Sequence, residues 1–449
     1  MDIDKVKTIR IIPSKSYAHR AYICDFLAGG DGSGVICSLD SDDIKATMSC
    51  LSGLADGNEE IDVRESGSTL RFILPLAGAL GKPVLIRTRG RLSERPMGPF
   101  EDELISHGMS IEHLPGGVIK ASGQLASGEY RLPGSISSQF ITGLLLSLPY
   151  LDGDSRIVLT SELQSSAYVD ITLDVLKEYG IRIEKTGTRR AEEDEKSCRT
   201  DSDVPAGYAI KGGQTYRREM SYIVEGDWSQ AAFWLAAGVI GKAPVRVAGL
   251  NNDSVQGDRK IADVLRRFGA EVEYEDEGFA AACPSEMHGT VVDVSEIPDL
   301  APAIACAAAA ASGETRLVNA GRLRLKESDR ISSIVGCLKD LGFSAEEGDD
   351  EIIIQGIGDS DHREHRIPAG GNAEEVMAAA GGASEEIVAA AGGTAETAGD
   401  HRIVMMAAVL SLITSGKVTI QGSSAVSKSY PTFFEELDKV GLAGNIQLD

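Results

Sequence analysis

The chain has 449 residues, with 44 Lys and Arg against 68 Asp and Glu, which gives a formal net charge of −24. This length exceeds what one hydrophobic core usually supports, so we expect two domains. The acidic charge argues against nucleic acid and membrane surfaces as partners, because both bind through positively charged protein surfaces. Net charge does not fix the sign of a local cleft, so a basic site is compatible with it.

No segment of the sequence indicates export, a membrane anchor or a metal site. Residues 1–5 are too polar to begin a signal peptide, and the longest apolar runs, 301–311 and 403–413, are shorter than the roughly 20 residues that cross a bilayer. The seven cysteines form no C-x-x-C pair and have no nearby His at metal-binding spacing. We therefore expect a cytoplasmic protein with free thiols.

A short motif, Leu-x-x-x-Gly followed by strand-like residues, recurs along the chain. Glycine at this position takes the left-handed conformation that ends a helix, so each copy predicts a helix followed by a strand. The four clear copies and a weaker one begin 72, 89, 73 and 99 residues apart. Two insertions, 186–207 and 369–399, lie in the long gaps, and we interpret them as surface loops. Without them the spacing predicts six similar units, three in each domain. The glycines are Gly57, Gly108, Gly180, Gly269, Gly342 and Gly441.

Serines at a regular distance before these glycines predict where the helices begin. Ser93, Ser165 and Ser254 each lie 15 residues before their glycine, and Ser328 lies 14 before its own. Serine is a favoured N-cap residue, so these positions predict helix starts. Ser41 and Ser427 are looser copies of the same pattern.

Several predicted helix starts combine Ser or Gly with basic residues. Residues 13–16 lead into an apolar run with Arg20 inside, and residues 65–69 and 134–139 precede two further runs. The N–H groups and the macrodipole of a helix N-terminus attract phosphate and carboxylate, so the number of such starts favours an anion site. Two other polar segments precede helices and have an ordinary structural interpretation that stays open. Asp299 could be a plain N-cap residue, and the charged residues of 322–330 could form a salt-bridged surface.

Together these segments resemble the 5-enolpyruvylshikimate-3-phosphate synthase family of enolpyruvyl transferases. The resemblance implies an α/β (α+β) fold of two globular domains, each made of three βαβαββ repeats that form an inside-out α/β barrel. The domains would comprise 14–225, and 1–13 together with 226–449. The matching segments, from about residue 11 to 437, are PSKSYAHR, ESGSTLR, RLSERPMG, SISSQF, VEGDWS, IPDLAP, LKESDR, GDHR and SKSYP.

The resemblance implies a transferase that moves the enolpyruvyl group of phosphoenolpyruvate to the 5-hydroxyl of shikimate 3-phosphate through a tetrahedral intermediate, in chorismate and aromatic amino acid biosynthesis. Asp299 and Lys15 would act at the hydroxyl, and Glu327 at the methylene carbon with support from His401. Neither metal nor cofactor is implied, and the protein would be a monomer inhibited by glyphosate. Shikimate 3-phosphate would contact Lys15, Ser16, Arg20, Ser137, Ser138, Gln139, Ser165, Tyr168, Asp299 and Lys326. Phosphoenolpyruvate would contact Lys15, Gly67, Arg95, Gln139, Arg330, Arg402 and Lys428.

Two other functions compete with this interpretation. The sister family that acts on UDP-N-acetylglucosamine has a reactive Cys in the loop corresponding to 91–100 and Asn after its first lysine, whereas this chain has no Cys there and Ser16 after Lys15. A non-catalytic anion-binding or nucleic-acid module on the related fold conflicts with the acidic net charge and with the paired acids Asp299 and Glu327. One departure from the family pattern is Arg322, which stands where many members have Asn, so its role is open.

Overall fold

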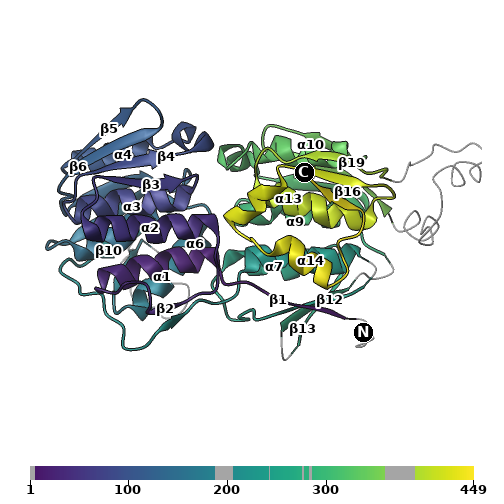
Figure 1. The fold of residues 1–449 in the computed structure, drawn as a ribbon, viewed down its shortest axis with the longest axis horizontal. Coiled ribbons are helices and arrows are strands. Elements are labelled where there is room, and N and C mark those ends of the chain that lie inside the picture. Colours follow the sequence, from purple (N-terminus) through teal and green to yellow (C-terminus); the bar gives the residue numbers. More distant parts are fainter. Residues whose placement is uncertain (1–5, 188–205, 242, 276–277, 283–285, 359–389) are drawn as a thin grey trace, which may run out of the picture. The chain divides into compact units, whose positions relative to one another are not determined.

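The computed structural model describes residues 6–187, 206–241, 243–275, 278–282, 286–358 and 390–449 (Figure 1). The chain packs into two compact units. The C-terminal unit comprises Met1–Ile11, Trp228–Leu250 and Asp258–Asp449, and the N-terminal unit comprises Ile12–Asp227 and Asn251–Gly257. The short segment Asn251–Gly257, which the sequence boundaries place in the second domain, therefore packs with residues 12–227.

The N-terminal unit contains two four-stranded sheets with the same topology. In each sheet the first two strands are parallel and joined by a helix, and the last two form an antiparallel hairpin. The first sheet and its helices are β3 (Glu60–Arg64), α3 (Gly67–Ala79), β4 (Val84–Thr88), α4 (Gly98–Ser106), β5 (Met109–Leu114) and β6 (Val118–Gly123). The second set is β7 (Glu129–Pro133), α5 (Ser138–Ser147), β8 (Ser155–Ser161), α6 (Ser166–Glu178), β9 (Ile183–Thr186) and β10 (Gly207–Ile210).

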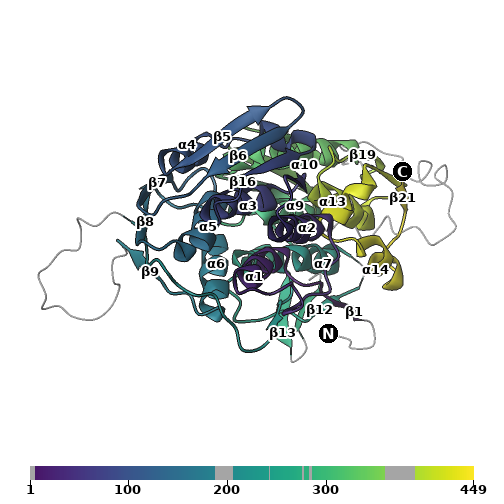
Figure 2. The ribbon, with the colours of Figure 1, turned by 60° about the vertical axis from the view of Figure 1, so that its left-hand side comes forward.

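A third, smaller group completes this unit. The strands β2 (Val35–Ile36) and β11 (Tyr222–Ile223) form a parallel pair beside α1 (Lys15–Leu27) and α2 (Asp42–Asp56). Helices α1, α2, α3, α5 and α6 pack against one another, with the strands of both large sheets outside them (Figure 2). Nearly every residue of α3 and α5 is buried, because these helices are covered on all sides.

The C-terminal unit repeats this plan. Its sheets have the orders β1-β12-β14-β13, β15-β16-β18-β17 and β19-β20-β21. The strand β1 (Lys7–Arg10) comes from the start of the chain and pairs in parallel with β12. The other strands are β12 (Val245–Ala248), β13 (Glu271–Glu275), β14 (Gly278–Ala282), β15 (Val291–Asp293), β16 (Ser312–Val318), β17 (Ser344–Glu347), β18 (Glu351–Ile357), β19 (Gly393–Glu396), β20 (Val418–Gln421) and β21 (Ile446–Leu448).

Three helices form the centre of this unit: α7 (Trp228–Ile240), α9 (Ala301–Ala310) and α13 (His401–Leu410). They contact one another, and every one of their residues is buried. The more exposed helices α8 (Ile261–Arg267), α10 (Arg330–Asp340) and α14 (Phe433–Lys439) each lead into the last strands of a sheet. No helix in the described parts of the chain is long and apolar enough to cross a membrane.

The repeated glycine joint is confirmed. All six glycines have positive φ, from 67° at Gly441 to 100° at Gly108, and each is followed by a strand. The repeats are not all complete, however. Among the described residues, four sheets have four strands in the predicted arrangement, whereas β19-β20-β21 and β2-β11 are reduced versions.

The serine caps are confirmed at only two positions. Ser41 caps α2 by accepting a hydrogen bond from the Ile44 N–H, and Ser165 is the N-cap residue of α6. The prediction is wrong at the other four serines. Ser93 and Ser427 lie in 3-10 turns, and Ser254 precedes one. At the first of these turns Pro96 holds Arg95 in an extended conformation, so α4 starts only at residue 98. Asp329, not Ser328, caps α10.

Most of the two predicted insertions, residues 188–205 of the first and 369–389 of the second, fall outside the described residues. At the first insertion, the flanking strands β9 and β10 pair with Thr186 opposite Gly207. The second insertion was predicted too long at its C-terminal end. Residues 393–396 form β19, which pairs in parallel with β20 and leads to the helix start at Asp400.

Candidate active site

In the N-terminal unit, the first turn of α1 carries a lysine that is held at both ends. The Lys15 backbone N–H donates to Asp227 Oδ2 at 3.0 Å, and Lys15 Nζ lies 2.8 Å from Asp43 Oδ2 in the first turn of α2. The side chains of Lys15 and Asp43 are 15% and 16% exposed. The ammonium group therefore has a defined position at the edge of the helix bundle.

Arg20, the next predicted site residue, joins α1 to α6. Its guanidinium group donates to the Ser16 carbonyl at 2.6 Å, the Tyr168 carbonyl at 2.9 Å and Thr172 Oγ1 at 2.8 Å. Burial lowers the pKa of Arg20 to about 10. The structure thus brings Ser16, Arg20 and Tyr168 together. Ser165 is the N-cap residue of α6, the helix that carries Tyr168, and has a left-handed conformation with φ of 56°.

The starts of α3 and α5 form the second group of predicted residues in this unit. Gly67 begins α3, and Gln139 in the first turn of α5 donates to Ser68 Oγ at 3.0 Å. A Cβ atom at Gly67 would lie 2.6 Å from both Arg71 Nη1 and Arg95 Nη1, so two guanidinium groups rest directly on this glycine. Arg71 was not among the predicted site residues, although it follows the Gly67 motif by one helical turn. Ser137 caps α5 and Ser138 begins it.

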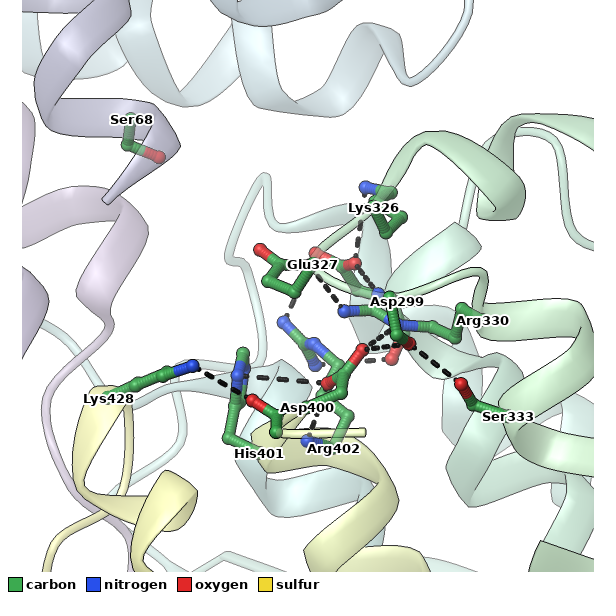
Figure 3. Close-up of polar contacts among 12 residues, drawn as sticks. Ser68, Asp299, Lys326, Glu327, Arg330, Ser333, Asp400, His401, Arg402 and Lys428 are labelled. Atoms are coloured by element: carbon green, nitrogen blue, oxygen red, sulfur yellow. Dashed lines mark hydrogen bonds and ion pairs between the residues drawn. The ribbon is translucent and has the colours of Figure 1, made fainter. Parts of the chain in front are cut away.

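In the C-terminal unit, Asp299 lies at the centre of an ion-pair cluster (Figure 3). It belongs to the 3-10 turn Pro298–Leu300 before α9, and its carboxylate contacts Lys326 Nζ at 3.3 Å, Arg330 Nη1 at 2.8 Å and Arg402 Nη2 at 3.1 Å. The N-cap residue of α9 is Leu300, with no side-chain cap. The alternative interpretation of Asp299 as a plain N-cap is therefore wrong.

Arg330, the first residue of α10, contacts three carboxylates at once. Nε lies 2.9 Å from Asp400, Nη1 2.8 Å from Asp299 and Nη2 2.7 Å from Glu327. Its side chain is 1% exposed. Burial by itself lowers the Arg330 pKa, but the charges of these three acids raise it above its ordinary value. Segment 322–330 is thus only partly salt-bridged surface: that interpretation fits the more exposed pair Arg324–Asp329, but not Arg330.

The remaining predicted residues complete the cluster. Burial lowers the pKa of Lys326, although the Asp299 carboxylate opposes that shift. His401 Nδ1 lies 3.8 Å from Asp400 Oδ1, and Lys428 Nζ donates to the Gly399 carbonyl at 2.8 Å. The cluster combines four cations with three carboxylates, so it is locally positive in a chain of net charge −24.

Comparisons with known proteins identify the family of the chain. The model of the EPSP synthase (3-phosphoshikimate 1-carboxyvinyltransferase) family matches residues 54–437, most of the chain. The chain belongs to the EPSP synthase family. Among EPSP synthase relatives, the 3-phosphoshikimate 1-carboxyvinyltransferase of Clostridium kluyveri is 37% identical over 96% of this chain and 94% of its own length. That of Clostridium acetobutylicum is 36% identical, with the same coverage.

Solved structures show the same fold over nearly the whole chain. An EPSP synthase from Acinetobacter baumannii has a TM-score of 0.69 at 23% identity, covering 97% of this chain and 95% of its own. The enolpyruvyl transferase NikO from Streptomyces tendae has a TM-score of 0.64 at 14% identity, covering 97% and 94%. The predicted family and its two-domain α/β fold are thus confirmed.

Two acids that hold candidate site residues are absent from the sequence prediction: Asp43, which contacts Lys15, and Asp400, which contacts Arg330. Asp400 opens the GDHR motif, and Asp43 directly precedes the apolar part of a helix. In both cases an acid beside a helix start looks like an ordinary cap. Within the described ranges, no group of three or more His, Cys, Asp and Glu side chains could hold a metal ion.

Proposed function

We infer that this EPSP synthase family member transfers the enolpyruvyl group of phosphoenolpyruvate to the 5-hydroxyl of shikimate 3-phosphate and releases phosphate. The observation that carries this inference is the pair Asp299 and Glu327, held by one buried arginine within a cluster that has more cations than acids. Two acids beside excess positive charge suit a reaction that moves two protons on anionic substrates. The near full-length match to 3-phosphoshikimate 1-carboxyvinyltransferases supports the choice of substrates.

The proposed reaction has an addition and an elimination. In the addition, the 5-hydroxyl oxygen bonds to C2 of phosphoenolpyruvate, its proton passes to Asp299 with help from Lys15, and Glu327 protonates C3. In the elimination, Glu327 removes a proton from C3, the C2–C3 double bond forms again, and the bond from C2 to the phosphate oxygen breaks. Each positioned proton transfer contributes about 10²- to 10⁴-fold. His401, next to Asp400, would support the Glu327 step.

The binding roles follow the two groups in the N-terminal unit and the cluster in the C-terminal unit. For shikimate 3-phosphate we propose Lys15, Ser16, Arg20, Ser137, Ser138, Gln139, Ser165, Tyr168, Asp299 and Lys326. For phosphoenolpyruvate we propose Lys15, Gly67, Arg95, Gln139, Arg330, Arg402 and Lys428. The N-terminus of α3 at Gly67 supports the second set, because its free N–H groups and a guanidinium group favour an anion.

In this proposal Arg20 acts mainly by shaping the binding site and less by contacting the substrate directly. Most of its donors already bind Thr172 and the Ser16 and Tyr168 carbonyls, so it shapes the shikimate 3-phosphate site mainly by holding those residues. We also propose that the protein is a cytoplasmic monomer and that glyphosate inhibits it.

The test is phosphate release from phosphoenolpyruvate by the purified protein. We expect release that depends on shikimate 3-phosphate and is absent with UDP-N-acetylglucosamine. Release with the second acceptor would favour the sister transferase, against which Ser16 and the cysteine-free loop 91–100 argue. No release with either acceptor would refute the proposed function.

A further inference from the structure

Asp400 is a buried acid to which the proposed reaction assigns no role. It is the N-cap residue of α13, and its side chain is fully buried. Its two carboxylate oxygens have different partners. Oδ1 accepts the Arg402 backbone N–H at 2.9 Å, which is the helix cap. Oδ2 accepts Arg330 Nε at 2.9 Å and Ser328 Oγ at 3.2 Å.

A helix cap alone does not require this arrangement. One oxygen satisfies the cap, and Ser, Thr or Asn supplies one as well as Asp. A buried charge is costly unless it is paired and hydrogen-bonded, so the second oxygen and the negative charge need a separate reason. That reason is Arg330: Asp400 lowers the cost of burying the guanidinium group and fixes its inner edge.

The exposure of the side chains along this network rises in one direction. Asp400 is 0% exposed and Arg330 1%, whereas Asp299 is 15% and Glu327 30% exposed. Arg330 therefore has a buried inner edge, Nε, bound to Asp400, and two outer tips, Nη1 and Nη2, bound to the two acids of the proposed reaction. Figure 3 shows Arg330 between Asp400 on one side and Asp299 and Glu327 on the other.

We propose that Asp400 is a positioning residue for the reaction: by holding Arg330 Nε it fixes the plane of the guanidinium group that places Asp299 and Glu327. This inference rests on the proposed function. During turnover Asp299 and Glu327 change protonation state and anionic substrates arrive, so their contacts with Arg330 change. The Asp400 contact lies away from the reacting atoms and keeps Arg330 in place throughout.

The charge of Asp400 also affects the protonation of Asp299 and Glu327. The charged and titratable groups that face it are Arg330, the first residue of α10, Glu327, which precedes that helix, and His401 from α13. With Asp400 neutral, the positive charge of Arg330 would be less compensated and would favour the ionised forms of Glu327 and Asp299. A Glu327 that must carry a proton would then lose it at lower pH.

The test compares two Asp→Asn substitutions at adjacent helix caps. Asp400→Asn keeps the side-chain volume and one oxygen for the cap of α13, but directs an amide NH₂ group at the Arg330 Nε–H. Asp329→Asn is the matched control: Asp329 caps α10 through the Ser332 N–H at 3.2 Å, and its other oxygen contacts the more exposed Arg324. The assay is phosphate release with both substrates across pH, with thermal unfolding measured on every variant.

We expect kcat of Asp400→Asn to fall about 100-fold, the cost of misplacing reacting groups by about 1 Å. Its alkaline pH limb should move to lower pH, while the KM for shikimate 3-phosphate stays within about twofold of wild type, since the contact Asp400 loses belongs to Arg330. Asp329→Asn should keep the wild-type kcat and pH limb. Wild-type turnover shows that the proposed function stands. A folded Asp400→Asn variant with normal kcat and an unmoved limb would then overturn the positioning role alone.

If Asp400→Asn does not fold, Ser328→Ala decides the question. This substitution keeps the cap and the ion pair but removes one of the three donors to the Asp400 carboxylate. A loss in kcat of about tenfold or more supports the proposal, given the usual contribution of one hydrogen bond to a charged group. A smaller loss overturns it.

Discussion

Replacing Gly67 by Ala tests whether the start of α3 binds phosphoenolpyruvate. The added methyl group would lie 2.6 Å from the terminal nitrogens of both Arg71 and Arg95, whereas ordinary contact begins at 3.4 Å. Each guanidinium tip must therefore retreat by 3.4 − 2.6 = 0.8 Å. Both are the far ends of long side chains, so they can move without disturbing the backbone.

The size of the effect follows from this displacement. Charge-assisted hydrogen bonds contribute about 1.5–3 kcal/mol, and every 1.4 kcal/mol is about tenfold in affinity. We therefore expect KM for phosphoenolpyruvate to rise about 10- to 100-fold. Folding stability should not fall. Gly67 has no positive φ to preserve, and Ala is favoured over Gly within a helix by about 0.5–1 kcal/mol.

Steady-state kinetics and thermal unfolding of two variants make the test. Gly98→Ala is the matched control, because Gly98 also begins a helix, α4, and a Cβ atom added there would have nothing within 4 Å. We expect a raised KM for phosphoenolpyruvate only in Gly67→Ala, and wild-type stability or better in both. A KM that stays within twofold of wild type in a folded Gly67→Ala protein would refute the reasoning.

Three further predictions concern Glu327, His19 and Asp43. Glu327→Ala should lower kcat by about 10²- to 10⁴-fold while calorimetry still detects shikimate 3-phosphate binding; near-normal turnover would contradict its acid–base role. Burial and two nearby cations hold the His19 pKa well below 6.5, so the unfolded chain binds a proton below pH 6.5 that the folded chain does not. Urea unfolding should thus show stability falling by up to about 1.4 kcal/mol per pH unit below that value, and less in His19→Gln. Asp43→Asn removes the carboxylate that holds Lys15 Nζ at 2.8 Å, so we expect kcat to fall about tenfold. Asp42→Asn on the same helix is the control and should leave kcat unchanged. Equal effects of the two substitutions would contradict the role of Lys15.

Local chemistry explains which parts of the fold the sequence could predict. A glycine with positive φ ends a helix through its own backbone freedom, so all six joints could be located from the residues alone. Serine caps are less specific, because Ser, Asp, Thr and even a 3-10 turn can serve a helix start. At Ser93 and Ser328 the neighbouring Pro96 and Asp329 decided the boundary instead.

The sequence by itself determined the family, the helix-to-strand joints and the types of residue at the candidate site, because motifs and turn chemistry are local. The contacts of Asp299 were decided only by the tertiary structure. Its partners Arg330 and Arg402 lie 31 and 103 positions away, and only packing of α9, α10 and α13 brings them within 3.1 Å. The ion pair of Asp400 with Arg330 could not be predicted from the sequence for the same reason. A cap depends on neighbours in the chain, whereas an ion pair with Arg330, 70 positions away, exists only in the folded protein.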